Sequence, residues 1–269
     1  MSSEGRNRLM CIEETMVLYD SAGNPVRTIV SIPTDARAVV VMSHGFTSSG
    51  DSGLYKEFQG EFNRLSIGTV RYDYYGHGPL YGHTSGYAVS ADVTLTKAVA
   101  SLNAVIAYLR GIGQYHIALL GASFGGLVSL VVAAQDPTVE RLILKSPVTE
   151  PIRFWQERLG NTQIREWQEQ GTLHDNHDIV EYDLSYDYWV DLQSYDTMRM
   201  SAGIRCSTLI IHGEKDTCVP IDQSRRLAAV LGTEVQVVIG AEHSYAEPDQ
   251  QAEMKRLITE SVRQWAEAD

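Results

Sequence analysis

A serine flanked by glycines is the strongest chemical signal in the sequence. Ser123 lies in a G-x-S-x-G motif at 121–125, after an apolar run that predicts a strand and before an aliphatic segment that predicts a helix. The motif needs this strand–turn–helix order to hold a serine hydroxyl above the end of a sheet. Glycines let strand and helix approach closely, and a helix N-terminus favours an oxyanion. We therefore predict that Ser123 is a nucleophile.

Two residues further along have the types and positions that would complete this chemistry. A serine nucleophile needs a base within hydrogen-bonding reach and a carboxylate that orients the base. Asp216 follows an apolar run at 207–212, and His243 follows the next such run. The order Ser, Asp, His is the one that serine hydrolases use on a parallel sheet. Glu214 is the second choice for the acid, and His212 is predicted to be structural.

An oxyanion hole is expected from two backbone N–H groups. One belongs to Phe124, directly after Ser123, and the other belongs to Phe46, in the loop after a predicted strand at 38–42. Loss of one such donor typically lowers the rate by about 10²–10³-fold. The His-Gly pair at 44–45 also fits a plain turn in which the histidine bonds nearby backbone, and the two interpretations are compatible.

The elements that must position these residues alternate along the chain from residue 38 onward. This alternation indicates an α/β fold with a doubly wound, mostly parallel sheet, whose chemistry lies beyond the carboxyl ends of the strands. Ser90 is the expected N-cap of a long helix that Gly111 ends. The predicted strands are 12–19 and 26–32, which form a hairpin, then 38–42, 68–72, 117–120, 141–145, 207–212 and 234–239; the predicted helices are 54–65, 90–110, the segment after Ser123, 222–231 and 249–266.

A segment at 147–200 interrupts the alternation. It is too long for a bare loop in a compact domain, so we expect a mostly helical cap inserted over the active site. The hydrolase core would then comprise residues 1–146 and 201–269.

Three side chains are predicted to contact the substrate: Val219, three residues after Asp216, and Tyr186 and Trp189 in the cap. In one interpretation the cap aromatics stack on an aromatic acyl group. In a second, the cap acids select a free amine, as an aminopeptidase requires. In a third, the acids form a solvated face while the aromatics pack the cap onto the core. The acids are Asp175, Asp178, Glu181, Asp183, Asp187, Asp191 and Asp196.

The composition limits the partners and the compartment. A net charge of −12 argues against nucleic acid or an anionic membrane surface as a partner. Cys11, Cys206 and Cys218 are odd in number and lack metal-ligand spacing, which indicates reduced thiols in a cytoplasmic protein. The polar N-terminus lacks the apolar stretch of a signal peptide.

No stable membrane insertion is expected. Residues 111–135 contain no Asp, Glu, Lys or Arg, but glycines and a serine interrupt this stretch, and its helical part is too short to span a bilayer. The expected partner is a small-molecule ester, and the sequence is compatible with a homodimer.

Five motifs together resemble the α/β-hydrolase superfamily. Within it, the chain is similar to a group of capped serine esterases that includes cinnamoyl (feruloyl) esterases, monoacylglycerol lipases and serine aminopeptidase-like proteins. The likeness spans about 12–267 except for the cap. One departure is Pro79, where relatives often carry Ser. The motifs are His44-Gly45-Phe46, Gly76-His77-Gly78, Gly121 to Gly126, Asp216 to Pro220, and Gly240 to His243.

The resemblance implies an enzyme that cleaves carboxylic esters through an acyl-enzyme intermediate, with hydroxycinnamoyl or other small to medium acyl groups as substrates. Ser123 would attack the carbonyl, His243 would act as general base, and Asp216 would hold the imidazole. No metal or organic cofactor is needed. Three alternatives remain open on the same scaffold: an aminopeptidase or amidase, a thioesterase, and a non-catalytic binding protein.

Overall fold

Eight strands form the central sheet of the computed structural model, which describes residues 12–83, 89–177 and 180–268. Their order is β1-β2-β4-β3-β5-β6-β9-β10. The strands are β1 (Glu13–Tyr19), β2 (Pro25–Ser31), β3 (Ala38–Ser43), β4 (Gly68–Tyr72), β5 (His116–Ala122), β6 (Val139–Lys145), β9 (Ser207–Gly213) and β10 (Val235–Val238).

The sheet is mostly parallel, as predicted. β1 and β2 form the expected antiparallel hairpin, β2 pairs antiparallel with β4, and every pairing from β4 to β10 is parallel. β3 is buried along its whole length because helices cover both faces of the sheet. That burial explains its continuous run of apolar residues.

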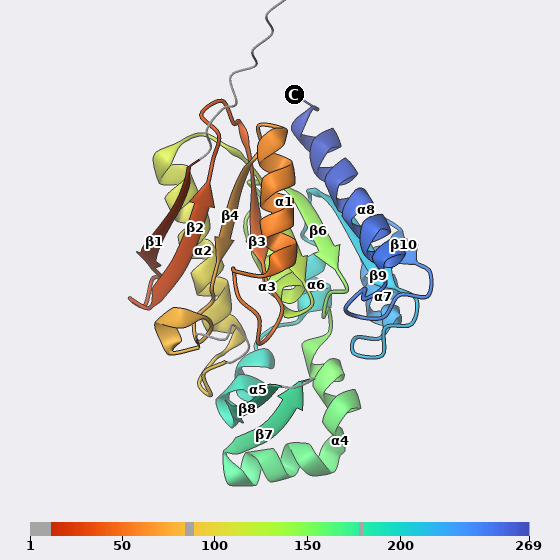
Figure 1. Ribbon diagram of the computed structural model, residues 1–269. Helices are drawn as coiled ribbons and strands as arrows, with labels where there is room; N and C mark the ends of the chain where they lie inside the picture. The colour runs from red at the N-terminus through yellow and green to blue at the C-terminus, as the bar shows by residue number, and fades with distance from the viewer. Residues whose placement is uncertain (1–11, 84–88, 178–179, 269) are drawn as a thin grey trace, which may run out of the picture.

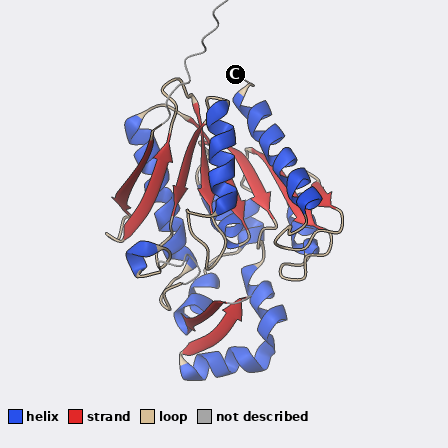
Figure 2. Ribbon diagram, viewed as in Figure 1, coloured by secondary structure: helices blue, strands red, loops and turns tan. Residues whose placement is uncertain are grey.

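Two layers of helices enclose the sheet (Figures 1 and 2). On one face α1 and α8 bury their apolar sides in one hydrophobic cluster, and on the other face α2, α3 and α7 pack in a second. The doubly wound architecture is therefore confirmed. The helices are α1 (Gly53–Arg64), α2 (Leu95–Ile112), α3 (Phe124–Gln135), α7 (Ile221–Leu231) and α8 (Pro248–Ala266), with a short 3₁₀ turn η1 at Pro79–Tyr81.

The start of α2 differs from the prediction. Thr94, not Ser90, caps the helix, because its side chain accepts a hydrogen bond from the Lys97 N–H at 3.2 Å. The N–H of Ser90 instead donates to the carbonyl of Gly76 at 2.8 Å, which ties this segment to the loop after β4. The helix also runs past Gly111 to a cap at Gly113.

The inserted segment is mostly helical, as expected, and it also contains a hairpin that the sequence analysis did not predict. Residues 181–184 alternate acidic and apolar, and this period of two places Tyr182 and Leu184 inside while Glu181 and Asp183 face outward. Figure 1 shows α4, α5 and the hairpin below the carboxyl end of the sheet. The elements are α4 (Pro151–Gln170), β7 (Thr172–His177), β8 (Val180–Ser185), α5 (Tyr186–Leu192) and α6 (Thr197–Ser201).

Candidate active site

Ser123 occupies a strained turn between β5 and α3. Its backbone has φ 52° and ψ −116°, a conformation that residues other than glycine rarely adopt. The glycines around it are required by close packing. A Cβ at Gly121 would lie 2.3 Å from the Gly125 carbonyl oxygen, and one at Gly125 would lie 2.0 Å from the Ser43 carbonyl oxygen. These contacts hold the serine at the carboxyl end of the sheet.

Asp216 lies just after β9, and both oxygens of its carboxylate accept hydrogen bonds. The Oδ1 atom accepts the backbone N–H groups of Cys218 and Val219 at 3.0 and 2.8 Å. The Oδ2 atom accepts a hydrogen bond from Nδ1 of His243 at 2.7 Å and lies 3.2 Å from Nε2 of His212. Burial opposes ionisation, but the hydrogen bonds from His212 and His243 outweigh it and hold the pKa of this carboxyl well below its ordinary value.

His243 is oriented by that hydrogen bond. Its Nδ1–H donates to Asp216, which leaves Nε2 as the acceptor nitrogen of the neutral ring. Burial lowers the pKa of His243 and the Lys145 ammonium lowers it further, whereas Asp216 acts in the opposite direction; the net shift is downward. The ring is therefore neutral at near-neutral pH. His243 and Ser123 line the same cavity.

The loop after β3 lies directly against the nucleophile. A Cβ placed on Gly45 would be 3.7 Å from Cβ of Ser123. Among the described residues, no acceptor is recorded for the backbone N–H of Phe46 or of Phe124, so both groups are available to an oxyanion. The His44 side chain bonds the carbonyl of Gly45 at 2.8 Å, so the turn interpretation of this pair also applies.

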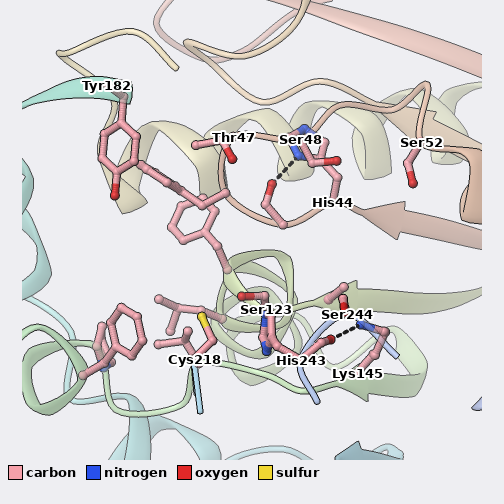
Figure 3. A pocket seen from close by; sticks show the side chains of 18 of the residues that line it. His44, Thr47, Ser48, Ser52, Ser123, Lys145, Tyr182, Cys218, His243 and Ser244 are labelled. Carbon is pink, nitrogen blue, oxygen red and sulfur yellow. Dashed lines mark hydrogen bonds between the residues drawn. The ribbon is translucent and has the colours of Figure 1, made fainter. Parts of the chain in front are cut away.

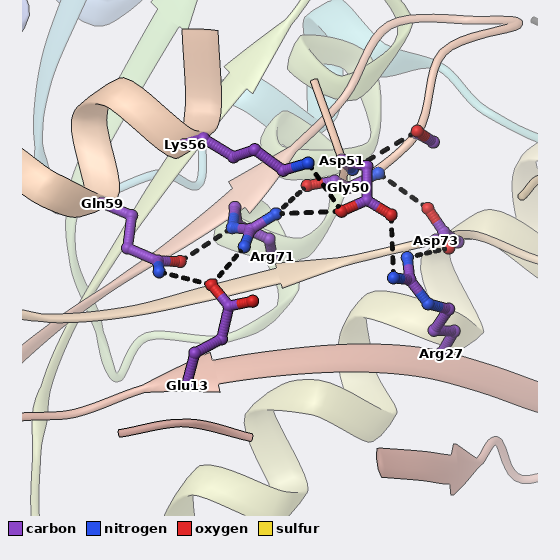
Figure 4. Close-up of polar contacts among 9 residues, drawn as sticks. Glu13, Arg27, Gly50, Asp51, Lys56, Gln59, Arg71 and Asp73 are labelled. Atoms are coloured by element: carbon purple, nitrogen blue, oxygen red, sulfur yellow. Dashed lines mark hydrogen bonds and ion pairs between the residues drawn. The ribbon is translucent and has the colours of Figure 1, made fainter. Parts of the chain in front are cut away.

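A buried arginine holds the far end of this loop (Figure 4). Arg71 on β4 is fully buried and donates to the carbonyl of Gly50 at 2.6 Å, to Gln59 at 2.8 Å and to Glu13 at 2.7 Å. The N–H of Gly50 donates to Asp73 at 2.7 Å. Polar groups buried in this way are stable only when they are paired, so the network gives the loop one preferred position.

A cavity of about 530 Å³ opens beside Ser123 and has two chemically distinct sides. We call the first the aromatic arm; it lies under the cap and is lined by Phe46, Phe124, Phe154, Trp155, Tyr182 and Tyr188. We call the second the polar arm; it is lined by Ser48, Ser52, Lys145 and Ser244. In Figure 3 Tyr182 and Lys145 lie on opposite sides of Ser123.

The family follows from the sequence. The model of the family described as serine aminopeptidase, S33, matches residues 34–247, which is most of the chain. The chain belongs to this family, within the α/β-hydrolase superfamily. Membership makes the protein a hydrolase. None of the curated proteins matches the sequence.

Solved structures share the fold of this S33 family chain. Est1E from Butyrivibrio proteoclasticus, determined with ferulic acid bound, is 23% identical, with a TM-score of 0.75 over 93% of this chain and 97% of that one. A putative hydrolase from Agrobacterium vitis S4 is 18% identical, with a TM-score of 0.77 over 94% and 99%. Mouse alpha/beta hydrolase domain-containing protein 10 is 17% identical, with a TM-score of 0.73 over 93% and 99%. The α/β-hydrolase fold is thereby confirmed.

Some predicted substrate contacts of the S33 chain lie away from the cavity. Val219 is fully buried beside Asp216, and its carbonyl accepts Nε2 of His212 at 2.9 Å. Tyr186 and Trp189 pack on Trp167 inside the cap, with ring centroids 5.8 and 6.3 Å apart. None of the three lines the cavity. Tyr186 and Trp189 belong to the short helix α5, whose residues point to different sides.

Other residues line the cavity. Tyr182 and Tyr188 are among the cap aromatics expected to stack on an aromatic acyl group, whereas Phe154, Trp155 and Lys145 were not assigned from the sequence. Tyr188 shares α5 with Trp189 but faces the cavity, and Phe154 and Trp155 reach it from α4. Lys145 is a charged residue that directly follows the three apolar residues Leu142, Ile143 and Leu144 in β6. Its position at the carboxyl end of a parallel strand could have indicated a role in the site, because chemistry on such a sheet lies at that edge.

The acidic residues of the cap mostly bond other protein groups. Asp175 pairs with Arg158 at 3.0 Å, Asp183 with His174 at 2.8 Å, and Asp196 caps α6. Asp191 accepts two hydrogen bonds from Thr96 of α2. Asp178 and Cys11 lie outside the described residues. No Asp or Glu lines the cavity among the residues described, which favours the structural interpretation of these acids.

Within the described ranges, no three His, Cys, Asp or Glu side chains gather closely enough to hold a metal ion. None of the described helices is long and apolar enough to cross a membrane.

Proposed function

We propose that this hydrolase cleaves carboxylic esters through an acyl-enzyme intermediate. The observation that carries the proposal is the Asp216–His243 hydrogen bond of 2.7 Å beside a strained Ser123, in one cavity. A neutral imidazole with a fixed tautomer is the base that a serine hydroxyl requires.

The proposed reaction has two balanced steps. Ser123 Oγ attacks the acyl carbonyl while His243 Nε2 takes its proton, and the Phe46 and Phe124 N–H groups bind the oxyanion. The alcohol then leaves with the proton from His243. Water then attacks the acyl-enzyme while His243 takes its proton, and His243 returns this proton to Ser123 Oγ as the acyl–oxygen bond breaks and the acid is released. Asp216 stays ionised throughout and stabilises the imidazolium, which its lowered pKa favours.

The aromatic arm supports an aromatic or other compact apolar acyl group as the substrate's acid part. Its side chains offer ring faces and edges to a planar group; the Phe46 ring, for example, meets those of Phe124 and Tyr182 at 5.3 and 5.4 Å between centroids. Est1E, which shares this fold, binds ferulic acid. Methyl ferulate is therefore the first aromatic ester to test.

An aminopeptidase is the second candidate because the family carries that description. Recognition of a substrate's free amine requires a carboxylate near the scissile bond, and none lines the cavity among the described residues. We therefore rank ester cleavage above amide cleavage.

Initial rates on four substrates test the proposal: 4-nitrophenyl acetate, methyl ferulate, a monoacylglycerol and an aminoacyl anilide. We expect ester turnover with preference for methyl ferulate. Preference for the anilide would contradict the ester assignment. Ser123→Ala should abolish turnover and labelling by a serine-directed phosphonate while the protein stays folded by circular dichroism. Unchanged labelling of the variant would rule out Ser123 as the nucleophile.

A further inference from the structure

Lys145 places a buried ammonium group next to the catalytic residues. It is the last residue of β6, only 9% of the residue's surface is exposed, and it lines the cavity. Nζ donates to the carbonyl of His243 at 3.1 Å and lies 4.4 Å from the ring centroid of Tyr245. An ammonium has three N–H donors, and burying its charge is costly unless a partner compensates it. Among the described residues, no carboxylate forms an ion pair with Nζ.

The nearest acid is already engaged. Asp216 attracts Lys145 through space, but both of its oxygens accept hydrogen bonds from the histidines and the backbone N–H groups beside it. It therefore has no free lone pair directed at the ammonium. Lys145 lines the cavity, and only one of its three N–H donors has a hydrogen-bond partner among the described residues.

The cavity is cationic although the whole chain is strongly acidic. Its described lining contains two basic side chains that are cationic at neutral pH, Lys145 and Arg158, and no Asp or Glu. Arg158 is bonded to Asp175 at 3.0 and 3.2 Å, so its charge is neutralised locally. Although the chain has a net charge of −12, Lys145 is the cation of the described cavity lining for which no ion pair is found.

The position of Lys145 indicates which part of the substrate it meets. The acyl and alcohol parts of an ester extend in different directions from the carbonyl carbon that Ser123 would attack. The aromatic arm fits the acyl part, and the polar arm lies on the other side of Ser123 (Figure 3). In Figure 3 Ser244 lies near Lys145, and Ser48 and Ser52 lie on the facing wall of the cavity. Ammonium and hydroxyl groups of this kind can donate hydrogen bonds to an anion.

We propose that the polar arm is an anion-binding subsite in which Lys145 determines specificity, and that the preferred substrates are esters whose alcohol part carries a carboxylate. This inference rests on the proposed esterase function. The carboxylate accepts a charge-assisted hydrogen bond from Nζ and further bonds from the serine hydroxyls. The leaving alcohol is then a hydroxy acid.

The protonation of Lys145 limits this preference to part of the pH range. Burial lowers the pKa of Lys145 to about 8, although Asp216 and Cys218 act in the opposite direction. His243 and Tyr245 also face the group. Below pH 8 the ammonium form predominates, and above it the amine is neutral. A preference that depends on this charge should therefore decline as the pH rises through 8.

The test compares two esters of matched shape. 4-Acetoxybenzoate releases an anionic phenol, and 4-acetoxybenzamide releases a neutral one of nearly the same size. The readout is the ratio of their kcat/KM values, because a general loss of activity cancels in that ratio. A hydrogen bond to a charged group contributes roughly 1.5–3 kcal/mol, so at pH 7 we expect a preference of roughly ten- to hundredfold for the anionic ester.

Three variants separate the charge from other effects. Lys145→Met should bring the ratio close to one, and Lys145→Gln, which keeps a donor but has no charge, should do nearly the same. Lys215→Met is the matched control: Lys215 is exposed beside Asp216 and lies outside the cavity, so its loss should leave the ratio unchanged. Thermal unfolding verifies that each variant is folded.

Each outcome decides between named possibilities. If the wild-type enzyme cleaves the neutral and the anionic ester with equal kcat/KM, the anion-binding subsite is contradicted but the esterase function is retained. A ratio retained in Lys145→Gln but lost in Lys145→Met would make Lys145 a positioning residue instead. Failure to cleave any ester, 4-nitrophenyl acetate included, would overturn the proposed function itself. If both Lys145 variants unfold, the wild-type ratio between pH 6 and 9.5 decides, since a pH-independent ratio contradicts the proposal.

Discussion

At the scale of single residues, the candidate site concentrates strain and buried charge. Thr47, Ser123, Ser146 and Tyr245 all have positive φ, and all lie in loops at the carboxyl end of the sheet. A non-glycine residue in that region costs roughly 1–3 kcal/mol and persists only where its surroundings enforce it. Ser146 and Tyr245 are also joined by a hydrogen bond of 3.1 Å between hydroxyls. The loops are therefore held rather than free.

The pH dependence of kcat/KM should report the environment of His243. The general base must be neutral, and burial together with Lys145 lowers the pKa of His243 below 6.5. Activity should therefore persist below the pH at which an ordinary imidazole is half protonated, and it should fall as the pH drops through the lowered pKa. Lys145→Met should move this acid limb to higher pH, because a nearby positive charge is removed.

Lys215→Met supplies the control for that shift. The exposed charge of Lys215 is screened by solvent and salt, so its removal should leave the acid limb in place. An acid limb in the wild type at or above pH 6.5 would contradict the assigned environment of His243.

At the scale of elements, the site depends on how closely α3 approaches the sheet. Gly125 in the first turn of α3 faces the carbonyl oxygens of Ser43 and His44, where any Cβ would lie 2.0 and 2.4 Å away. Gly126 meets Pro147 in the same way at 2.7 Å. The helix N-terminus can lie beneath the nucleophile only because these side chains are absent.

Gly125→Ala should therefore destabilise the protein by at least roughly 3 kcal/mol, because backbone atoms of β3 and its loop cannot move aside cheaply. Gly60→Ala in α1 is the matched control. A Cβ there meets nothing nearer than 3.8 Å, and helix propensity predicts a gain of roughly 0.5–1 kcal/mol. Chemical denaturation of both variants measures the difference. Equal stabilities would show that the close approach of α3 does not constrain the fold.

At the scale of the whole molecule, the cap is joined to the core by specific polar bonds as well as by aromatic packing. Asp191 of α5 accepts hydrogen bonds from the N–H and the hydroxyl of Thr96 at 3.0 and 2.5 Å. A cap residue thus provides the acceptor for a backbone N–H in the first turn of α2. The Ser185 N–H donates to the carbonyl of Ala91 at 2.8 Å. These bonds set the cap over the aromatic arm.

Asp191→Ala should loosen this joint. Loss of a capping carboxylate typically costs about 1–2 kcal/mol, and a less ordered cap should raise KM for an aromatic ester more than it lowers kcat. Asp187→Ala, which removes an exposed acid from the same helix, should change both quantities little. Thermal unfolding and steady-state kinetics of the pair measure these effects. An equal KM in the two variants would argue against a role for the joint in substrate binding.

The sequence by itself determined the order of elements and the positions that could carry chemistry. Strands buried on both faces read as continuous apolar runs, and the carboxyl ends of parallel strands share one edge, so Ser123, Asp216 and His243 could be assigned to neighbouring loops before any coordinates. The sequence analysis did not predict the strand β8, although residues 181–184 alternate between acidic and apolar residues.

Only the tertiary structure decided which side chains face the cavity. The sequence does not distinguish among the aromatic residues of α5. In the structure Tyr186 and Trp189 pack against Trp167, whereas Tyr188 lines the cavity. From the sequence, Lys145 is only the last residue of a predicted strand. Its place in the cavity depends on contacts of Nζ with the His243 carbonyl and the Tyr245 ring, about a hundred residues further along the chain. Local patterns specify elements because they depend on neighbours in the chain. The lining of a cavity depends on contacts between distant segments, which local patterns do not contain.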